Sequence, residues 1–89
     1  MAHFFATGSG HGVLDHHHDL PAGTSLGARA FVGSVVELDS NNNPFQGSAT
    51  LWISNIWPEI VNGAFVRVHY RVHVDWGSDL KYQVTMIFE

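Results

Sequence analysis

The sequence predicts an all-β protein, a four- to five-stranded antiparallel meander that forms a small sandwich or barrel behind an irregular His- and Gly-rich N-terminal arm. Three observations predict it. Apolar residues recur at every second position, β-branched residues dominate the alternating runs, and turn residues separate those runs. No helix of useful length fits a spacing of two, so we expect none.

The arm is expected over residues 1–27, which are rich in Gly and His and show no sustained period. Such a segment predicts a loop, with at most one short strand around residues 3–6. Residues 28–89 are then expected to form a single antiparallel β domain. The chain is thus expected to divide into an arm, residues 1–27, and this domain.

Four strands are expected in this domain, at about 28–38, 45–57, 64–76 and 80–89. The clearest is the third, where the even positions from Val66 to Trp76 are apolar or aromatic and the odd positions are polar. A period of two predicts a strand with one buried face and one wet face. The turns are expected at Asp39–Pro44, at Asn62-Gly63, which is the strongest two-residue hairpin signal in the chain, and at residues 77–79.

These turns predict a register. A hairpin at residues 77–79 would set Val74 beside Tyr82 and Asp75 beside Lys81, and would pair Arg67 with Glu89. The other two turns would set Leu51 beside Val74, Ile53 beside Val72, Trp57 beside Val68 and Ala30 beside Ile53. One apolar face then runs across all four strands.

That apolar face must be covered. The arm holds few large apolar residues, so we expect a homo-oligomer, most simply a two-fold symmetric dimer. Closure into a barrel, or a sandwich completed by the first 27 residues, are the alternatives.

The opposite face carries the candidate ligand-binding residues. The register places aromatic rings beside Arg and His, namely Arg29, Phe31, Trp52, His69, Arg71 and His73. Aromatic faces and planar guanidinium groups suit a small anionic or sugar ligand. The alternative is a second small core or a contact with another protein.

A second candidate site is the run Asp15-His16-His17-His18-Asp19. Neutral imidazole is the commonest protein ligand of metals, and carboxylates can ligate or orient a ring, so the run predicts a site for a divalent metal such as zinc. A solvated loop is the alternative. His69 and His73 lie about 13 Å apart on a strand, too far for one ion to join them.

Composition limits the partners. The net charge is −4 with only four Lys and Arg, so we do not expect nucleic-acid binding. No apolar run approaches the ~18 residues of a membrane span, and the N-terminus lacks the pattern of a signal peptide, so we expect a cytoplasmic protein. There is no Cys.

No phosphate loop or nucleophile elbow is present. We therefore expect a small non-enzymatic β-domain that acts as a binding or assembly module through oligomerisation. Two alternatives remain open: a metal-binding protein, including a metal-dependent enzyme, that uses His16–His18, and a binder of a small sugar or anion on the Arg29/Phe31/Trp52/Arg71/His73 face.

Overall fold

The computed structural model describes residues 2–20, 30–63 and 65–89, which form seven antiparallel strands in two sheets. The strands are β1 (Ala2–Gly10), β2 (Gly12–Leu20), β3 (Phe31–Leu38), β4 (Pro44–Phe45), β5 (Thr50–Val61), β6 (Phe65–Asp75) and β7 (Leu80–Phe88). One sheet has the order β1-β7-β3-β4 and the other β2-β6-β5, and one of the two is curled into a half-barrel. The predicted all-β antiparallel class is confirmed.

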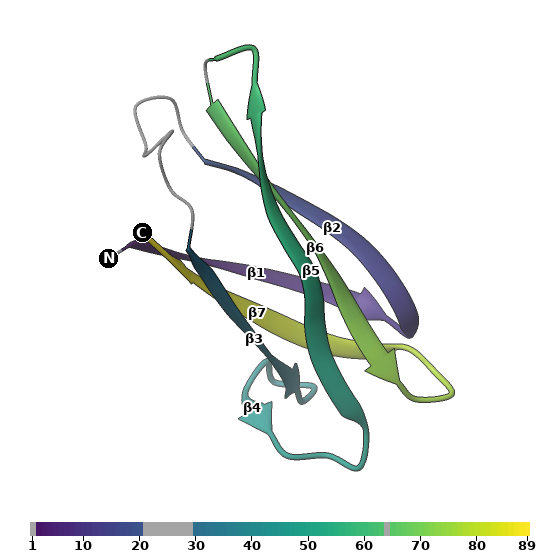
Figure 1. The fold of residues 1–89 in the computed structure, drawn as a ribbon. Coiled ribbons are helices and arrows are strands. Elements are labelled where there is room, and N and C mark those ends of the chain that lie inside the picture. The colour runs from purple at the N-terminus through teal and green to yellow at the C-terminus, as the bar shows by residue number, and fades with distance from the viewer. Residues whose placement is uncertain (1, 21–29, 64) are drawn as a thin grey trace.

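The two sheets lie one over the other, and two of the connections between them are short corners (Figure 1). One corner joins β1 to β2, where Gly12 has a φ of 77°, a conformation that favours glycine. The other joins β6 to β7. The corners are tied together, since His11 Nδ1 lies 2.5 Å from Asp79 Oδ1. No helix occurs in the described ranges, so none there is long and apolar enough to cross a membrane.

The hairpin of β5 and β6 forms at Asn62-Gly63, as predicted. Both residues have positive φ, 54° and 66°, and Val61 pairs with Phe65, so three residues (62–64) connect the paired positions where a two-residue turn was predicted. The register agrees at Ile53 with Val72 and at Leu51 with Val74. It shifts by one residue further along, so that Trp57 lies beside His69 and not beside Val68.

A β-bulge causes this shift. The ladder between β5 and β6 is interrupted between Ser54 and Trp57, and Asn55 within the interruption has a φ of 55°. An extra residue in one strand turns the following side chains to the other face. Trp57 therefore points outward and Ile56 packs against the core.

The predicted hairpin of residues 64–76 with 80–89 is wrong. β7 pairs with β1 and β3, for example Val84 with Ala6 and Val35, while β6 lies in the other sheet. The alternation predicts the two strands correctly, but it specifies only which face of each strand is buried. Two strands whose apolar faces meet across a core have the same pattern as two strands paired in a hairpin. Asp75 and Lys81 are consequently not ladder partners, and Arg67 pairs with Asp19 in place of Glu89.

The pairing predicted between the first two strands is also wrong. β3 forms ladders with β7 and with the two-residue β4, and β5 lies in the other sheet. Ala30 exchanges backbone hydrogen bonds with Glu89, at 3.2 and 3.1 Å, and not with Ile53. Trp76, expected on the buried face, lies in the corner after β6 and is 45% exposed.

The irregular arm is wrong over residues 2–20, which form two nine-residue strands. β1 extends the sheet beside β7 and β2 extends the other beside β6. Gly8 shows why the strand pattern is weak in this segment. A Cβ at this position would lie 2.8 Å from the Tyr82 hydroxyl, so the structure requires a small residue where an alternating pattern would have a large apolar one. The rest of the expected arm, residues 21–29, lies outside the described residues.

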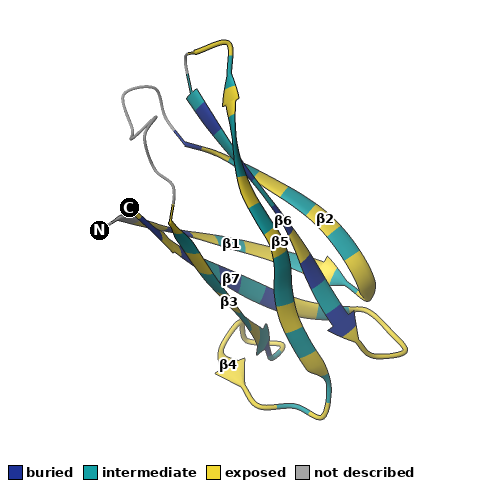
Figure 2. Cartoon of the chain, in the orientation of Figure 1, coloured by how far each residue is buried: buried dark blue, intermediate teal, exposed yellow. Residues whose placement is uncertain are grey.

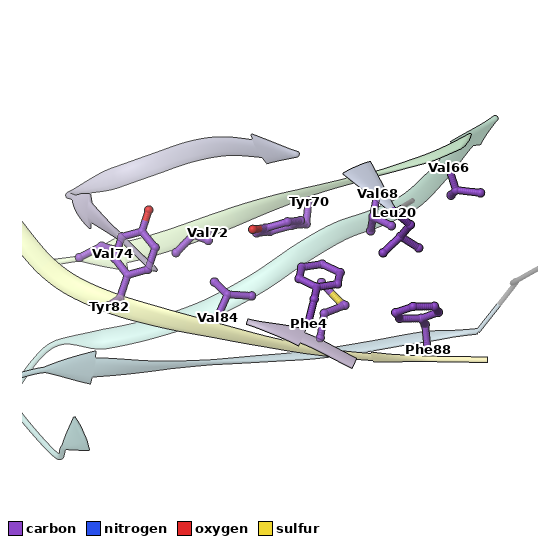
Figure 3. Close-up of a cluster of buried hydrophobic side chains, with 11 residues drawn as sticks. Phe4, Leu20, Val66, Val68, Tyr70, Val72, Val74, Tyr82, Val84 and Phe88 are labelled. Carbon is purple, nitrogen blue, oxygen red and sulfur yellow. The ribbon is translucent and has the colours of Figure 1, made fainter. Parts of the chain in front are cut away.

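The core lies between the sheets and is built from the even positions of β6 and β7 (Figure 2). Val68, Val72 and Met86 are completely buried. Phe4 and Leu20, from β1 and β2, close the cluster, as Figure 3 shows. The apolar face that was expected to need a second copy is therefore covered by strands of the same chain. Burying one such side chain contributes about 1.5–3 kcal/mol.

Candidate ligand-binding site

The solvent-facing side of the β2-β6-β5 sheet, called here the outer face, gathers most of the chemically active side chains. The ladder arranges them in four rows across three strands. Rows of aromatic rings alternate with rows of charges: Val13–His73–Trp52, Asp15–Arg71–Ser54, His17–His69–Trp57 and Asp19–Arg67–Glu59.

Two Trp–His stacks dominate this face. The rings of Trp52 and His73 are 4.7 Å apart and 6° from parallel, and those of Trp57 and His69 are 4.3 Å apart and 10° from parallel. The two Trp residues are 45% and 50% exposed. Large apolar rings with that exposure most often mark a contact surface.

Each histidine of the stacks is held by a second partner. His69 donates from Nε2 to Glu59 Oε1 at 2.8 Å, and His73 Nε2 lies 2.6 Å from Ser54 Oγ. An imidazole that is both stacked and hydrogen-bonded has little rotamer freedom. The indoles are therefore presented in fixed orientations, which lowers the entropic cost of binding a ligand.

The arginines of this face are paired with aspartates. Arg67 donates to both oxygens of Asp19, at 2.8 and 3.2 Å, and Arg71 Nε donates to Asp15 Oδ1 at 3.0 Å. The hydrogen bond from Arg67 lowers the pKa of Asp19, and the same bond raises the pKa of Arg67. Because both guanidinium charges are offset, the outer face presents no strong positive field to an anion.

A depression of about 340 Å³ lies beside the bulge of β5. Its lining residues come from all three strands: Asp15, His16, Asn55, Trp57, His69, Tyr70 and Arg71. The volume is at the lower end of the ~300–1,000 Å³ range of small-molecule sites. The bulge builds this place, since it turns Trp57 outward and leaves Asn55 outside the ladder.

Two other depressions, of about 500 and 370 Å³, are lined by neither Trp, His nor Arg among the described residues. The second contains Glu37, whose Oε1 is buried without a hydrogen-bond partner in the part of the chain that the structure describes. The first has no aromatic residue in its lining, and the second combines Phe45 with only two polar side chains in an otherwise apolar lining. The depression at the bulge is therefore the candidate site.

The structure brings together four of the six predicted ligand residues on the outer face: Trp52, His69, Arg71 and His73. Phe31 is not among them. It stacks on Phe88 at 5.6 Å on the inner side of the other sheet, because β3 pairs with β7. Arg29 lies outside the described residues. Sequence reasoning missed Asn55 and Trp57, for which the only signal was an Asn in mid-strand.

The triple histidine does not converge on one point. His16 and His18 point inward, where His16 stacks on Tyr70 at 5.5 Å and His18 on Phe4 at 3.9 Å. His17 points outward beside His69, 6.3 Å away. The flanking Asp15 and Asp19 bind the two arginines. Within residues 2–20, 30–63 and 65–89, no group of three His, Cys, Asp or Glu is arranged to hold a metal ion.

The contact of Ser54 with His73 resembles part of a hydrolytic triad but lacks the rest. Among the described side chains, no carboxylate hydrogen-bonds the remaining nitrogen of His73, and the ring lies against Trp52. A nucleophile and base work as a unit when a third group orients the base. We interpret the contact as one that positions His73.

No protein-family model, curated protein or solved structure matches the chain. Its class is therefore defined by fold and site alone, as a two-sheet antiparallel β protein with a preorganised aromatic outer face.

Proposed function

We propose that the protein is a small non-enzymatic binding module that holds a small ligand on the outer face of the β2-β6-β5 sheet. The observation that carries the proposal is the exposed Trp57, fixed by its stack on His69 and by the bond from His69 to Glu59. Exposed indoles fixed beside polar groups are a common feature of recognition sites. Among the described side chains, no carboxylate orients His73 beside Ser54, which favours a binding function over hydrolysis.

The test uses the three Trp indole N–H signals in a nitrogen-15 NMR spectrum. Mixtures of sugars, nucleotides and carboxylates are added in turn. We expect one mixture to shift the signals of Trp52 and Trp57 and to leave that of Trp76, which lies in the β6–β7 corner, in place. Replacing Trp57 with Ala should abolish the shift of Trp52. If every mixture leaves both signals unmoved, the proposal fails.

Assembly of copies is a second candidate, favoured by the solvent-facing side of the other sheet. There Phe5, Val32 and Ile87 are 57%, 69% and 38% exposed on adjacent strands β1, β3 and β7. A two-fold axis through Thr85, midway along β7, would set Lys81 of one copy over Glu89 of the next. That complementarity makes a second copy the occupant we propose for this side.

Native mass spectrometry tests the assembly. The assembly is supported if the unchanged protein forms dimers, if Val32→Glu abolishes them and if replacing Lys81 with Glu weakens them. The double change Lys81→Glu with Glu89→Lys should restore the dimer, because the two charges exchange places. A monomer at high protein concentration would exclude it.

A further inference from the structure

We infer that the depression at the β5 bulge binds a neutral polyhydroxylated ring, that is, a sugar. The inference rests on the proposed function, because it names the ligand class for the same outer face. It is drawn from four side chains that line the depression: Asp15, Asn55, Trp57 and Arg71.

The pair of Asp15 and Arg71 offers acceptors and donors side by side. Only Arg71 Nε and Asp15 Oδ1 bond each other, at 3.0 Å. The terminal nitrogens of that guanidinium and the second carboxylate oxygen have no other side-chain partner in the described residues. A hydroxyl group both donates and accepts, so neighbouring hydroxyls on a ring satisfy the carboxylate and the guanidinium together.

Asn55 adds a group that also donates and accepts. Its amide carries two N–H donors and one carbonyl acceptor. The residue sits at the bulge with a φ of 55°, a conformation that Asn tolerates better than most residues. The ladder of β5 is interrupted there, so the position serves the depression more than the sheet.

Trp57 supplies an apolar wall. Its stack on His69 fixes the indole, and half of the residue remains exposed. The C–H groups of a sugar ring form a flat apolar patch that packs on such a ring, while the hydroxyls at its rim face polar side chains. A depression with one aromatic wall and several mixed donors and acceptors matches that pattern.

Charge argues for a neutral ligand over an anionic one. The lining carries one carboxylate, Asp15, and one guanidinium, Arg71, and they already form an ion pair. An anion would have to approach Asp15 without an unpaired cation to compensate, which costs free energy. A neutral ring meets no such penalty.

The experiment titrates glucose, galactose, mannose and N-acetylglucosamine, with inorganic phosphate and citrate as anionic probes, into the labelled protein. We expect at least one sugar to shift the Trp57 indole signal at millimolar concentration, and neither anion to do so. Asp15→Asn should weaken sugar binding about tenfold or more, since it removes a charge-assisted hydrogen bond. The same variant should gain affinity for phosphate, because Arg71 loses its counter-charge.

Asn55→Gly removes the amide and keeps the backbone conformation, since glycine accepts the positive φ. Asn55→Gly should weaken binding of the same sugar, and its NMR spectrum should remain that of a folded protein. Trp76→Phe is the matched control, a tryptophan of the β6–β7 corner that does not line the depression, and should leave the sugar affinity unchanged. If phosphate or citrate shifts the Trp57 indole signal and no sugar does, the sugar inference is overturned and the proposed function stands. If no probe moves Trp52 or Trp57, the sugar inference is overturned, and broader mixtures decide the proposed function.

Discussion

The imidazole Nε2 of His16 lies 2.5 Å from the hydroxyl oxygen of Tyr82, and this bond joins the two sheets. His16 belongs to β2 and Tyr82 to β7. The bond lies where β1 and β2, which follow each other in the chain, diverge into different sheets. This junction of the two sheets is called the seam. Tyr70 supports it from β6 by a nearly parallel stack on His16, at 9°. Burial lowers the pKa of His16 and raises those of Tyr70 and Tyr82.

The lowered pKa of His16 predicts that the protein loses stability in acid. Above about pH 6.5 His16 is neutral in both states, and below it the unfolded chain takes up the proton more readily than the native one. The free energy of unfolding should therefore fall as the pH drops through 6.5 towards the native pKa. Of the charged neighbours, Asp15 opposes this effect and His17 adds to it.

Urea unfolding at a series of pH values between 7.5 and 5 measures this dependence. His16→Phe should be less stable at every pH, because Tyr82 loses its partner, but its slope with pH should be shallower. His3→Phe, at an exposed position of β1, controls for the removal of an imidazole. An unchanged slope in His16→Phe would show that the dependence arises elsewhere.

Gly8 is predicted to be irreplaceable for the same seam. A Cβ at this position would lie 2.8 Å from Oη and 2.9 Å from Cζ of Tyr82, so Gly8→Ala must displace the phenol from His16. Overpacking of this kind costs about 1–3 kcal/mol. Gly77→Ala is the control, because nothing lies within 4 Å of its added Cβ. Equal unfolding midpoints for the two variants would contradict this account of the seam.

The residues of this seam also explain what the sequence could not predict. A hydropathy pattern finds strands whose inward positions are aliphatic, such as Val68 and Val72 in β6. In β1 and β2 the inward positions include Gly8, His16 and His18, which are half-buried against aromatic rings and are not hydrophobic in the pattern. Residues 2–20 were therefore expected to be irregular, although they complete both sheets.

The second feature that the sequence did not predict is which strands pair with each other. The hairpin at Asn62-Gly63 was predicted, and its predicted register is correct at Leu51 and Ile53 but differs by one residue between the bulge and the turn. The corner at residues 77–79 has the composition of a turn but joins strands of different sheets. For the site, the pairing of Trp52 with His73 followed from that correct hairpin. The bulge at Asn55 had no detectable pattern, so Trp57 was assigned to the wrong face.

Adjacent positions on β7 test the assignment of faces in the core. Met86 is completely buried, whereas Ile87 is 38% exposed on the other side of the sheet. Met86→Ala should lower the free energy of unfolding by about 2–5 kcal/mol, since it leaves a cavity between the sheets. Ile87→Ala should cost under about 1 kcal/mol on the same reasoning. Urea denaturation measures both, and a larger loss in Ile87→Ala would invert the assignment.

Zinc is predicted not to stabilise the native protein, despite the triple histidine. To ligate one ion together, His16 and His18 would have to leave their stacks on Tyr70 and Phe4, and His17 would have to turn from the opposite face. A metal held by the native state at a hundred times its Kd would raise the free energy of unfolding by about 2.7 kcal/mol. We expect the urea midpoint to be the same with zinc as with a chelator, in protein purified without a metal column. A zinc-dependent rise that disappears in the double variant His16→Phe with His18→Phe would instead show that the strand rearranges around a metal.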